Sequence, residues 1–178
     1  QCSGRPVVAA ASFNPPNTPI DPETGRGSPF PCYVYATQVA DVEVDVETGL
    51  VKVLRIVAAH DVGKAINPTL LQVQVEGGIA MGLGQALTEE IKLRDGRTRN
   101  PNFREYLIPT AMDTPQVEVC IVEDPEPSGP FGAKAAAEAP NIPTTPAILN
   151  AIYDATGVRI RELPATPEKI LSALKQSG

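Results

Sequence analysis

Prolines set the tightest limit on how this chain can fold. The 178 residues include 19 prolines, against 4% aromatic residues and no tryptophan. Because proline fixes φ and lacks a backbone N–H, it interrupts helices and central strands. Residues 1–32 are dense in proline and other turn-forming residues, which predicts an extended connecting arm where only Val7 to Ala11 could form a short strand. Residues 33–178 are expected to form one domain whose long irregular segments lie against another surface.

Charge and cysteine spacing exclude several classes of function. The formal net charge is -6 and the basic residues are scattered, so nucleic acid and anionic membrane surfaces are not expected partners. No stretch approaches the ~18 uninterrupted apolar residues of a membrane span, and a soluble, cytoplasmic protein is expected. Cys2, Cys32 and Cys120 have no CxxC spacing, which argues against a disulfide framework, a zinc site or an iron–sulfur cluster held by this chain.

A β-hairpin is predicted at the start of the domain. From Tyr33 to Val46, β-branched residues alternate with acidic ones, and Glu47-Thr48-Gly49 supplies a turn into a second strand, Leu50 to Ala59. Alternate residues of a strand point to opposite faces, so the hairpin is expected to have one acidic, solvent-facing side.

A long helix is expected next, from about Thr69 to Glu90, entered through Ile66-Asn67-Pro68. Small residues recur along it, at Gly77, Gly78, Gly82, Gly84 and Ala86. Each glycine inside a helix costs about 1 kcal/mol relative to alanine, so these positions need a compensating close approach by another backbone. We interpret them as a tight packing surface, a ligand-adjacent surface, or both.

The remaining elements alternate between strands and helices. They are expected as a hairpin of Glu89 to Leu93 with Phe103 to Ile108 around the turn Asp95-Gly96, a strand Val117 to Val122, and helices Thr145 to Thr156 and Pro167 to Lys175. Mixed helices and antiparallel hairpins predict an α+β fold.

Residue types alone offer few candidates for chemistry. One histidine cannot build a side-chain metal site, and the glycines from 77 to 84 lie inside the predicted helix, which excludes a P-loop or Rossmann site. Glu138 follows three alanines and precedes Ala139-Pro140, so its carboxylate stands on a narrow surface. Such a carboxylate in an apolar pocket could act as a general base or acid. The alternative is a solvated glutamate paired with Lys134 across one helical turn.

Several longer motifs occur in register along the domain. They are Asp61-Val62-Gly63-Lys64-Ala65-Ile66-Asn67-Pro68, the run from Gln74 to Leu87, Tyr106-Leu107-Ile108-Pro109-Thr110, and Gly129-Pro130-Phe131-Gly132-Ala133-Lys134 followed by Glu138 and Pro140. In this order and spacing, the chain from about residue 30 onward resembles the C-terminal region of the molybdopterin-binding subunit of the xanthine dehydrogenase/aldehyde oxidase/carbon monoxide dehydrogenase family.

The resemblance implies part of the molybdopterin-binding domain of a molybdenum hydroxylase, a molybdenum-dependent oxidoreductase that oxidises an aldehyde or N-heterocycle with water-derived oxygen. Glu138 matches the family's general base. Asn67, Gln74 and the backbone of Lys134, Ala135, Ala136 and Ala137 match cofactor-contacting positions. The pterin sulfurs hold the metal in this family, so no protein metal ligand is expected.

The resemblance also implies cofactors and partners. The cofactor is molybdenum–molybdopterin, expected in its cytosine dinucleotide form, with iron–sulfur clusters and FAD on partner chains or domains. The expected partners are the remaining N-terminal part of the molybdenum subunit, the iron–sulfur and flavin subunits of a hetero-oligomer, and a small-molecule substrate. The chain begins without methionine, and we interpret it as a fragment or split subunit that is inactive alone.

Two departures leave alternatives open. Ala137 and Val73 stand where the family usually has glycine, and alanine would be strained at 137 if that backbone needs a positive φ. One alternative is therefore a non-catalytic structural or assembly segment of such a complex. Another is a generic α+β binding domain whose motif register is coincidence.

Overall fold

The computed structural model describes residues 4, 8–15 and 17–177. The chain divides into two compact units, Gln1–Tyr33 and Val34–Gly178. In the first unit, Thr18 and Ser28 form an isolated antiparallel bridge. Residues 8–11 form no strand, so the predicted short strand is wrong there, and Val7 lies outside the described residues. The assignment of 1–32 as a connecting arm and 33–178 as a cofactor-domain portion stays a prediction.

The predicted hairpin opens the second unit. β1 (Ala36–Val44) pairs antiparallel with β2 (Val51–Asp61), which confirms the prediction. In the turn, the Asp45 carboxylate accepts hydrogen bonds from the amides of Glu47 and Thr48 at 2.9 and 3.2 Å. Gly49 adopts a φ of 76° there, a conformation that favours glycine. The acidic residues of β1, Asp41 and Glu43, are exposed as expected.

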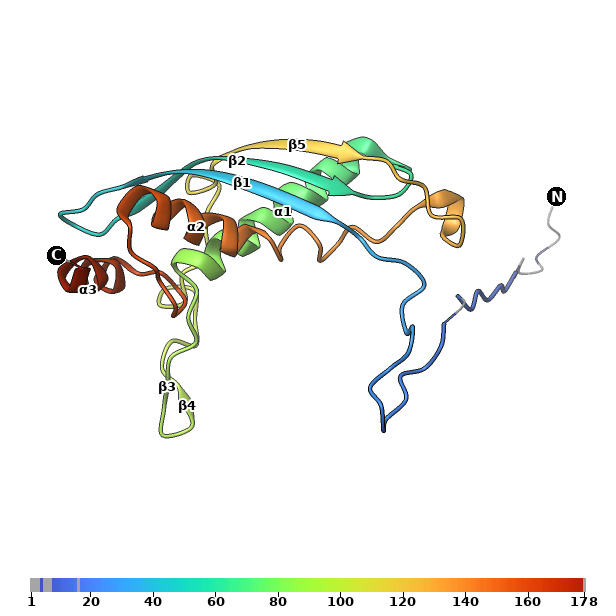
Figure 1. Cartoon of the computed structure of the whole chain (residues 1–178), viewed down its shortest axis with the longest axis horizontal. Helices are drawn as coiled ribbons and strands as arrows, with labels where there is room; N and C mark the ends of the chain where they lie inside the picture. Colours follow the sequence, from blue (N-terminus) through green and yellow to red (C-terminus); the bar gives the residue numbers. More distant parts are fainter. Residues whose placement is uncertain (1–3, 5–7, 16, 178) are drawn as a thin grey trace. The chain divides into compact units, whose positions relative to one another are not determined.

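A third strand joins this hairpin in a way that the sequence did not predict. β5 (Gln116–Val122) pairs parallel with β2, giving the sheet order β1-β2-β5. Parallel neighbours need a long crossover connection, and here it contains α1 (Pro68–Leu87). Figure 1 shows the three strands arched over α1 and α2 (Thr144–Thr156).

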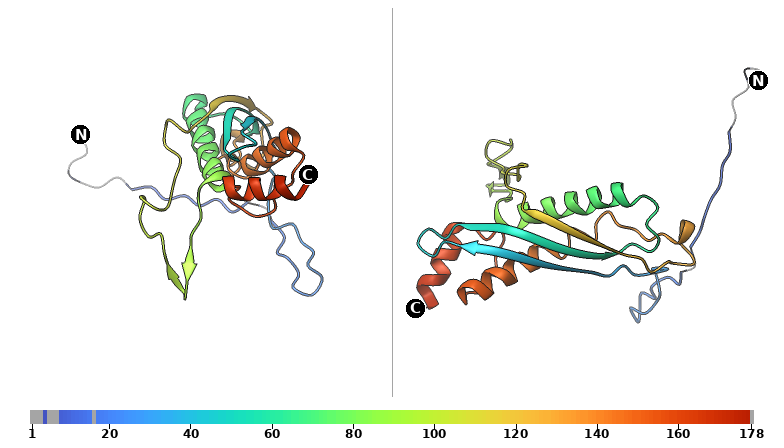
Figure 2. Two further views of the ribbon diagram at one scale, coloured as in Figure 1. Left: turned by 90° about the vertical axis from the view of Figure 1, so that its left-hand side faces the viewer. Right: turned by 90° about the horizontal axis from the view of Figure 1, so that it is seen from above.

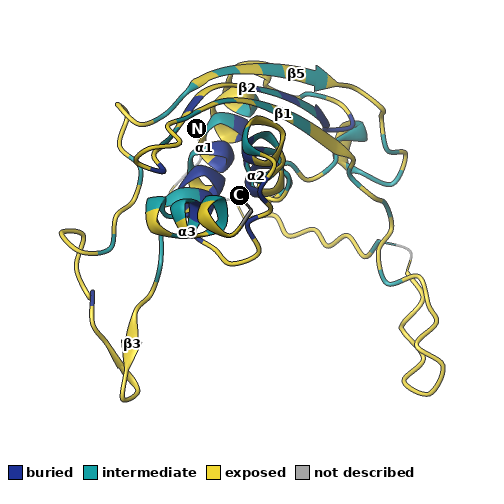
Figure 3. Ribbon diagram, turned by 60° about the vertical axis from the view of Figure 1, so that its left-hand side comes forward, coloured by how far each residue is buried: buried dark blue, intermediate teal, exposed yellow. Residues whose placement is uncertain are grey.

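The helices cover one face of this sheet. Seen from above in Figure 2, α1 lies on the β5 side and α2 on the β1 side. The core between the layers includes Ile56 of β2, Ile79 of α1 and Ile148 of α2, all fully buried, and Figure 3 shows buried residues gathered there. A short 3-10 helix, η1 (Pro130–Gly132), precedes α2, and α3 (Pro167–Ser177) follows it. The α+β fold is confirmed.

The second hairpin is shorter than predicted. β3 (Leu93–Arg94) and β4 (Arg97–Thr98) flank the two-residue turn Asp95-Gly96, whose φ angles are 52° and 72°. A two-residue turn with positive φ at both positions pairs the residues immediately beside it. The partner strand therefore lies at 97–98, and the prediction of a strand from Phe103 to Ile108 is wrong.

Some glycines of α1 lie close to another part of the chain and another faces solvent. A Cβ atom added at Gly78 would be 2.7 Å from Pro140 Cβ, and one at Gly82 would be 2.5 Å from Thr144 Cβ. The Thr145 hydroxyl also donates to the Gly82 carbonyl at 3.0 Å. Gly78 and Gly82 thus permit the close approach that the sequence predicted, whereas Gly77 faces open space.

Alanine at the two adjacent glycines should have opposite effects on stability. Gly78→Ala places a methyl group against the rigid Pro140 ring, so we expect a loss of about 1–3 kcal/mol, as at other overpacked sites. Gly77→Ala is the matched control and should gain up to about 1 kcal/mol of helix propensity. Denaturant unfolding of the protein measures both changes, and equal stabilisation at the two positions would contradict this packing.

Candidate functional site

The segment that carries Glu138 pairs at its start with the residues that follow β2. Gly63 and Ala133 form an isolated antiparallel bridge. The Lys134 amide donates to the Val62 carbonyl at 2.9 Å, and the Lys64 amide donates to the Gly132 carbonyl at 2.8 Å. Gly63 has a φ of 64°, and a Cβ there would overlap the Gly132 carbonyl oxygen. Glycine is therefore required for this backbone-to-backbone approach.

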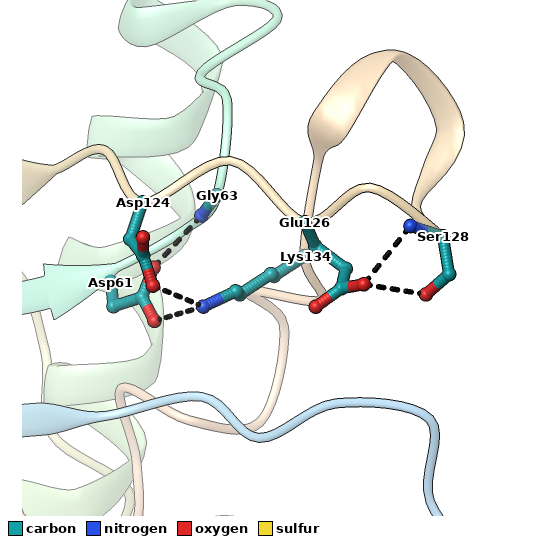
Figure 4. A network of polar contacts seen from close by, with 6 residues as sticks. All are labelled: Asp61, Gly63, Asp124, Glu126, Ser128 and Lys134. Carbon is teal, nitrogen blue, oxygen red and sulfur yellow. Dashed lines mark hydrogen bonds and ion pairs between the residues drawn. The ribbon is translucent and has the colours of Figure 1, made fainter.

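An internal ion pair reinforces the same junction (Figure 4). The Lys134 side chain is only 5% exposed, and its Nζ atom lies 2.6 Å from Asp61 Oδ2 and 3.1 Å from Asp124 Oδ2. The Asp61 side chain is 8% exposed, and its other oxygen accepts from the Gly63 amide at 3.0 Å. The alternative pairing of Lys134 with Glu138 is wrong, because residues 134–138 are not helical.

Both members of this pair are held in their charged forms. Burial alone would raise the pKa of Asp61, but the hydrogen bonds from Lys134 and Gly63, with the lysine charge, outweigh it and lower that pKa. The hydrogen bond to Asp61 raises the pKa of Lys134 against the opposing effect of burial, with a further contribution from Asp124.

Beyond Lys134 the backbone leaves a row of N–H groups unpaired, although the Glu138 carbonyl accepts from the Asn141 amide at 3.0 Å. Within the described chain, the amides of Ala135, Ala136, Ala137 and Glu138 donate to no other residue. Ala135, Ala137 and Glu138 are exposed. The Glu138 carboxylate likewise has no hydrogen-bond partner among the described residues. The segment therefore presents a short row of available donors followed by an available carboxylate.

The far end of the segment is fixed at Pro140. Its carbonyl accepts hydrogen bonds from Gln38 Nε2 at 2.8 Å and from the Thr144 hydroxyl at 2.9 Å. Gln38 Nε2 also lies 3.2 Å from Nε2 of His60, and the Thr144 hydroxyl lies 2.7 Å from Gln38 Oε1. Because the Gln38 amide nitrogen can only donate, His60 Nε2 accepts and Nδ1 carries the proton.

His60 belongs to the interior of the domain. It is 2% exposed, and burial lowers its pKa, which favours the neutral ring. Its Nδ1 atom is buried with no partner in the described structure. Sequence reasoning missed Gln38, His60 and Thr144 as supports of the site. Only the position of His60 beside the Asp61 motif could have drawn attention to it.

The structure brings one further predicted residue to the segment. Gln74 is exposed on α1, and its Nε2 atom donates to the Ala137 carbonyl at 3.4 Å. Asn67 instead caps α1, accepting from the Leu70 amide at 3.1 Å. No hydrogen bond joins Asn67 to residues 134–138 in the described structure.

The expected strain at Ala137 is not found. Among the described non-glycine residues, positive φ angles occur at Asp95 and Phe131. Phe131, at 55°, precedes Gly132 and is 89% exposed. Alanine at 137 is therefore compatible with the backbone of this segment.

Other possible sites lie elsewhere or offer no metal ligands. In the described part of the chain, no three His, Cys, Asp or Glu side chains gather as a metal site, and Cys32 and Cys120 are free. Cys2 lies outside the described residues. A cavity of about 790 Å³ lies between the start of β2, the end of α1 and residues 107–116, and none of the predicted site residues line it. Among the described helices, none is both long and apolar enough for a membrane span.

Comparison with known proteins identifies the family. The sequence matches the molybdopterin cofactor-binding domain over residues 1–115, more than half of the chain, and the chain belongs to this family. The matched range includes Asn67 and Gln74 and ends before Lys134 and Glu138. The generic binding-domain hypothesis is therefore wrong.

Relatives support the same assignment over a longer range. The chain is 43% identical over 140 residues to the xanthine dehydrogenase molybdenum-binding subunit of Escherichia coli O157:H7, covering 78% of this chain and 19% of the relative. Aldehyde oxidoreductase from Desulfovibrio gigas has a solved structure with 38% identity and a TM-score of 0.83, covering 89% of this chain and 17% of that chain. Quinoline 2-oxidoreductase from Pseudomonas putida 86 has a solved structure with 34% identity and a TM-score of 0.72, covering 76% of this chain and 18% of that chain.

The chain thus spans about a fifth of the length of these relatives. The resemblance drawn from the motifs is confirmed: this is a molybdopterin-binding region of the xanthine dehydrogenase/aldehyde oxidoreductase family.

The Asp61–Lys134 pair should contribute to stability within a defined pH window. The folded pKa of Asp61 is lowered, so its contribution is present above about pH 4 and is lost as pH falls through the folded value. The folded pKa of Lys134 is raised, so its contribution is present below about pH 10 and is lost as pH rises through the folded value.

Melting temperatures of the wild type and an Asp61→Asn/Lys134→Met double variant measure this effect. The difference between them should stay constant from about pH 5 to 9, and the wild type should lose stability relative to the variant on either side. A difference that stays constant down to strongly acidic pH would contradict the ion pair.

Proposed function

We propose that this chain is part of a molybdenum hydroxylase that oxidises an aldehyde or N-heterocycle with water-derived oxygen, and that Glu138 is its general base. One observation carries the proposal: an unpartnered, exposed carboxylate follows a row of unpaired amides, on a segment fixed at both ends, in a molybdopterin-binding family member. A catalytic carboxylate needs this combination of availability and fixed position.

The residues present fit a molybdopterin cofactor. Unpaired backbone amides suit an anionic ligand that is rich in hydrogen-bond acceptors, and the small side chains of Ala135, Ala136 and Ala137 let such a ligand reach the backbone. Gln74 would complete this surface from α1, because its amide reaches Ala137. Asn67 would act less directly, by fixing the first turn of the same helix.

The protein residues and the cofactor would have separate tasks. When bound, the molybdenum cofactor supplies the redox chemistry and an activated water-derived hydroxyl group. Glu138 would accept the proton from that hydroxyl, since both of its oxygens are without internal partners in the described structure.

The larger assembly forms part of the same proposal. The chain spans about a fifth of its relatives, and catalysis would require the remaining N-terminal part of the molybdenum subunit. Iron–sulfur and flavin subunits or domains would carry electrons away, and the cofactor would be the cytosine dinucleotide form. We place the complex in the cytoplasm and expect this chain to be inactive alone.

The non-catalytic assembly hypothesis has weaker support. It depended on Ala137 and Val73 standing where the family usually has glycine, and neither residue has a positive φ. A segment kept only for assembly would also have no use for an available glutamate beside unpaired amides.

Replacing the carboxylate of Glu138 tests the assignment of the base. Glu138→Gln keeps the side-chain shape but removes the proton acceptor, so we expect turnover by the intact complex to fall by at least about 100-fold. Molybdenum content, measured by elemental analysis, should be unchanged.

Glu47→Gln is the matched control, because Glu47 is an exposed glutamate in the β1–β2 turn, at the opposite end of β2 from Asp61. It should keep wild-type turnover. Retained turnover in Glu138→Gln would remove the base assignment. A native complex without molybdenum would remove the hydroxylase proposal itself.

A further inference from the structure

We propose that Lys134 and Asp61 act as a positioning pair for the segment that carries Glu138, and that the Lys134 ammonium contacts neither cofactor nor substrate. The inference rests on the proposed function, because it assigns a role to the geometry around Glu138. The sequence motif groups Lys134 with the following alanines as cofactor-contacting positions. The present inference gives Lys134 a different role from those alanines.

The polar groups of Lys134 are already used inside the domain. Its amide donates to Val62, and its ammonium lies against Asp61 and Asp124. The Lys134 side chain is only 5% exposed, whereas Ala135 and Ala137 are exposed. Of the polar groups of Lys134, its backbone carbonyl alone has no partner in the described structure.

Asp61 joins two parts of the junction through its two oxygens. Oδ1 accepts from the Gly63 amide, which fixes the turn after β2, and Oδ2 pairs with Lys134 on the other strand of the bridge (Figure 4). Asp124 adds a second acceptor for the ammonium, but its side chain is 77% exposed, so it contributes less. The cost of removing both charges from water offsets much of their attraction, so net stability alone does not account for a buried pair of this kind.

The segment between its two anchors depends on them for its position. The upstream anchor is Lys134, the downstream anchor is the Pro140 carbonyl, and the amides of 135–138 make no internal hydrogen bonds in the described chain. Between the anchors, the Gln74 side chain donates to the Ala137 carbonyl at 3.4 Å, which is a weak contact. The Glu138 carbonyl accepts from the Asn141 amide at 3.0 Å, which is a turn on the downstream side. Loss of the upstream anchor should thus displace Glu138 four residues away.

The experiment uses the intact, molybdenum-loaded protein and three variants: Lys134→Met, Asp61→Asn and the double variant. Lys64→Met is the matched control, because Lys64 forms an exposed ion pair with Glu123 at 2.8 Å beside the same junction. Turnover, KM, molybdenum content and hydrogen exchange of the Lys64 amide and of the amides from 132 to 141 are measured for each protein.

Lys134→Met should lower kcat by about 100-fold through misplacement of the base, with KM nearly unchanged. It should also speed hydrogen exchange at the Lys64 and Lys134 amides, which form the bridge. Lys64→Met should change neither. Because the double variant no longer buries an unpaired carboxylate, it should recover at least about tenfold in kcat over Lys134→Met.

Three outcomes would overturn the positioning pair. Unchanged exchange and kcat in Lys134→Met would show that the segment does not need this anchor. A double variant no better than Lys134→Met would indicate a direct contact of the ammonium with cofactor or substrate. If Lys134→Met does not fold, Asp61→Asn should show the same faster exchange and lower kcat, and wild-type values in Asp61→Asn would equally overturn the pair.

The exchange measurement separates this inference from the proposed function. Turnover retained in Glu138→Gln, together with faster exchange in Lys134→Met, would remove Glu138 as the base and leave the anchor in place. Turnover lost in Glu138→Gln, with unchanged exchange and kcat in Lys134→Met, would support the base and remove the anchor.

Discussion

The close approach of α1 to residues 140–144 supports both the core and the candidate site. Gly78 and Gly82 provide the room for it, since a side chain at either position would collide with Pro140 or Thr144. Thr144 begins α2, so the same contact sets how α2 packs beneath the sheet. Pro140 ends the segment that carries Glu138 and is held by Gln38 of β1. Packing of the core and placement of the candidate base therefore depend on the same glycines.

The candidate site combines available polar groups with fixed ends. An unpaired amide or carboxylate is useful to a ligand only when it is exposed, yet an exposed segment without internal hydrogen bonds has little to hold it in one conformation. The stiffness here comes from both sides: a backbone bridge with a buried ion pair before the segment, and a partly buried Gln38–His60–Thr144 network after it. This arrangement limits the entropy that a bound cofactor would have to remove.

Local patterns predicted the elements, whereas long-range pairings did not follow from them. The β1–β2 hairpin and the three α-helices come from periodicity, turns and caps that act within a few residues. The parallel pairing of β5 with β2 and the contact of Lys134 with Asp61, 73 residues apart, depend on how those elements pack. The error at Phe103–Ile108 arose because a two-residue turn fixes its own partner strand. Residue chemistry singled out Glu138 but equally allowed a solvated glutamate, and only the motif resemblance predicted Glu138 as the base and Gln74 as a cofactor contact.

The surface of α1 connects this domain to the assembly that we propose. One side of the helix is buried through Val75, Ile79 and Leu83, while Leu70, Val73 and Met81 on other sides are 59–66% exposed. Large apolar side chains exposed on a helix are typically covered by another chain segment, because exposed apolar surface is unfavourable in water. These exposed side chains lie on the helix that also carries Gln74, and Gln74 contacts Ala137. A chain segment that covers them would therefore also enclose the surface beside Ala137. Exclusion of water strengthens every electrostatic interaction there, so a segment of the proposed partner that covers these side chains would strengthen the contacts of Glu138 and the unpaired amides.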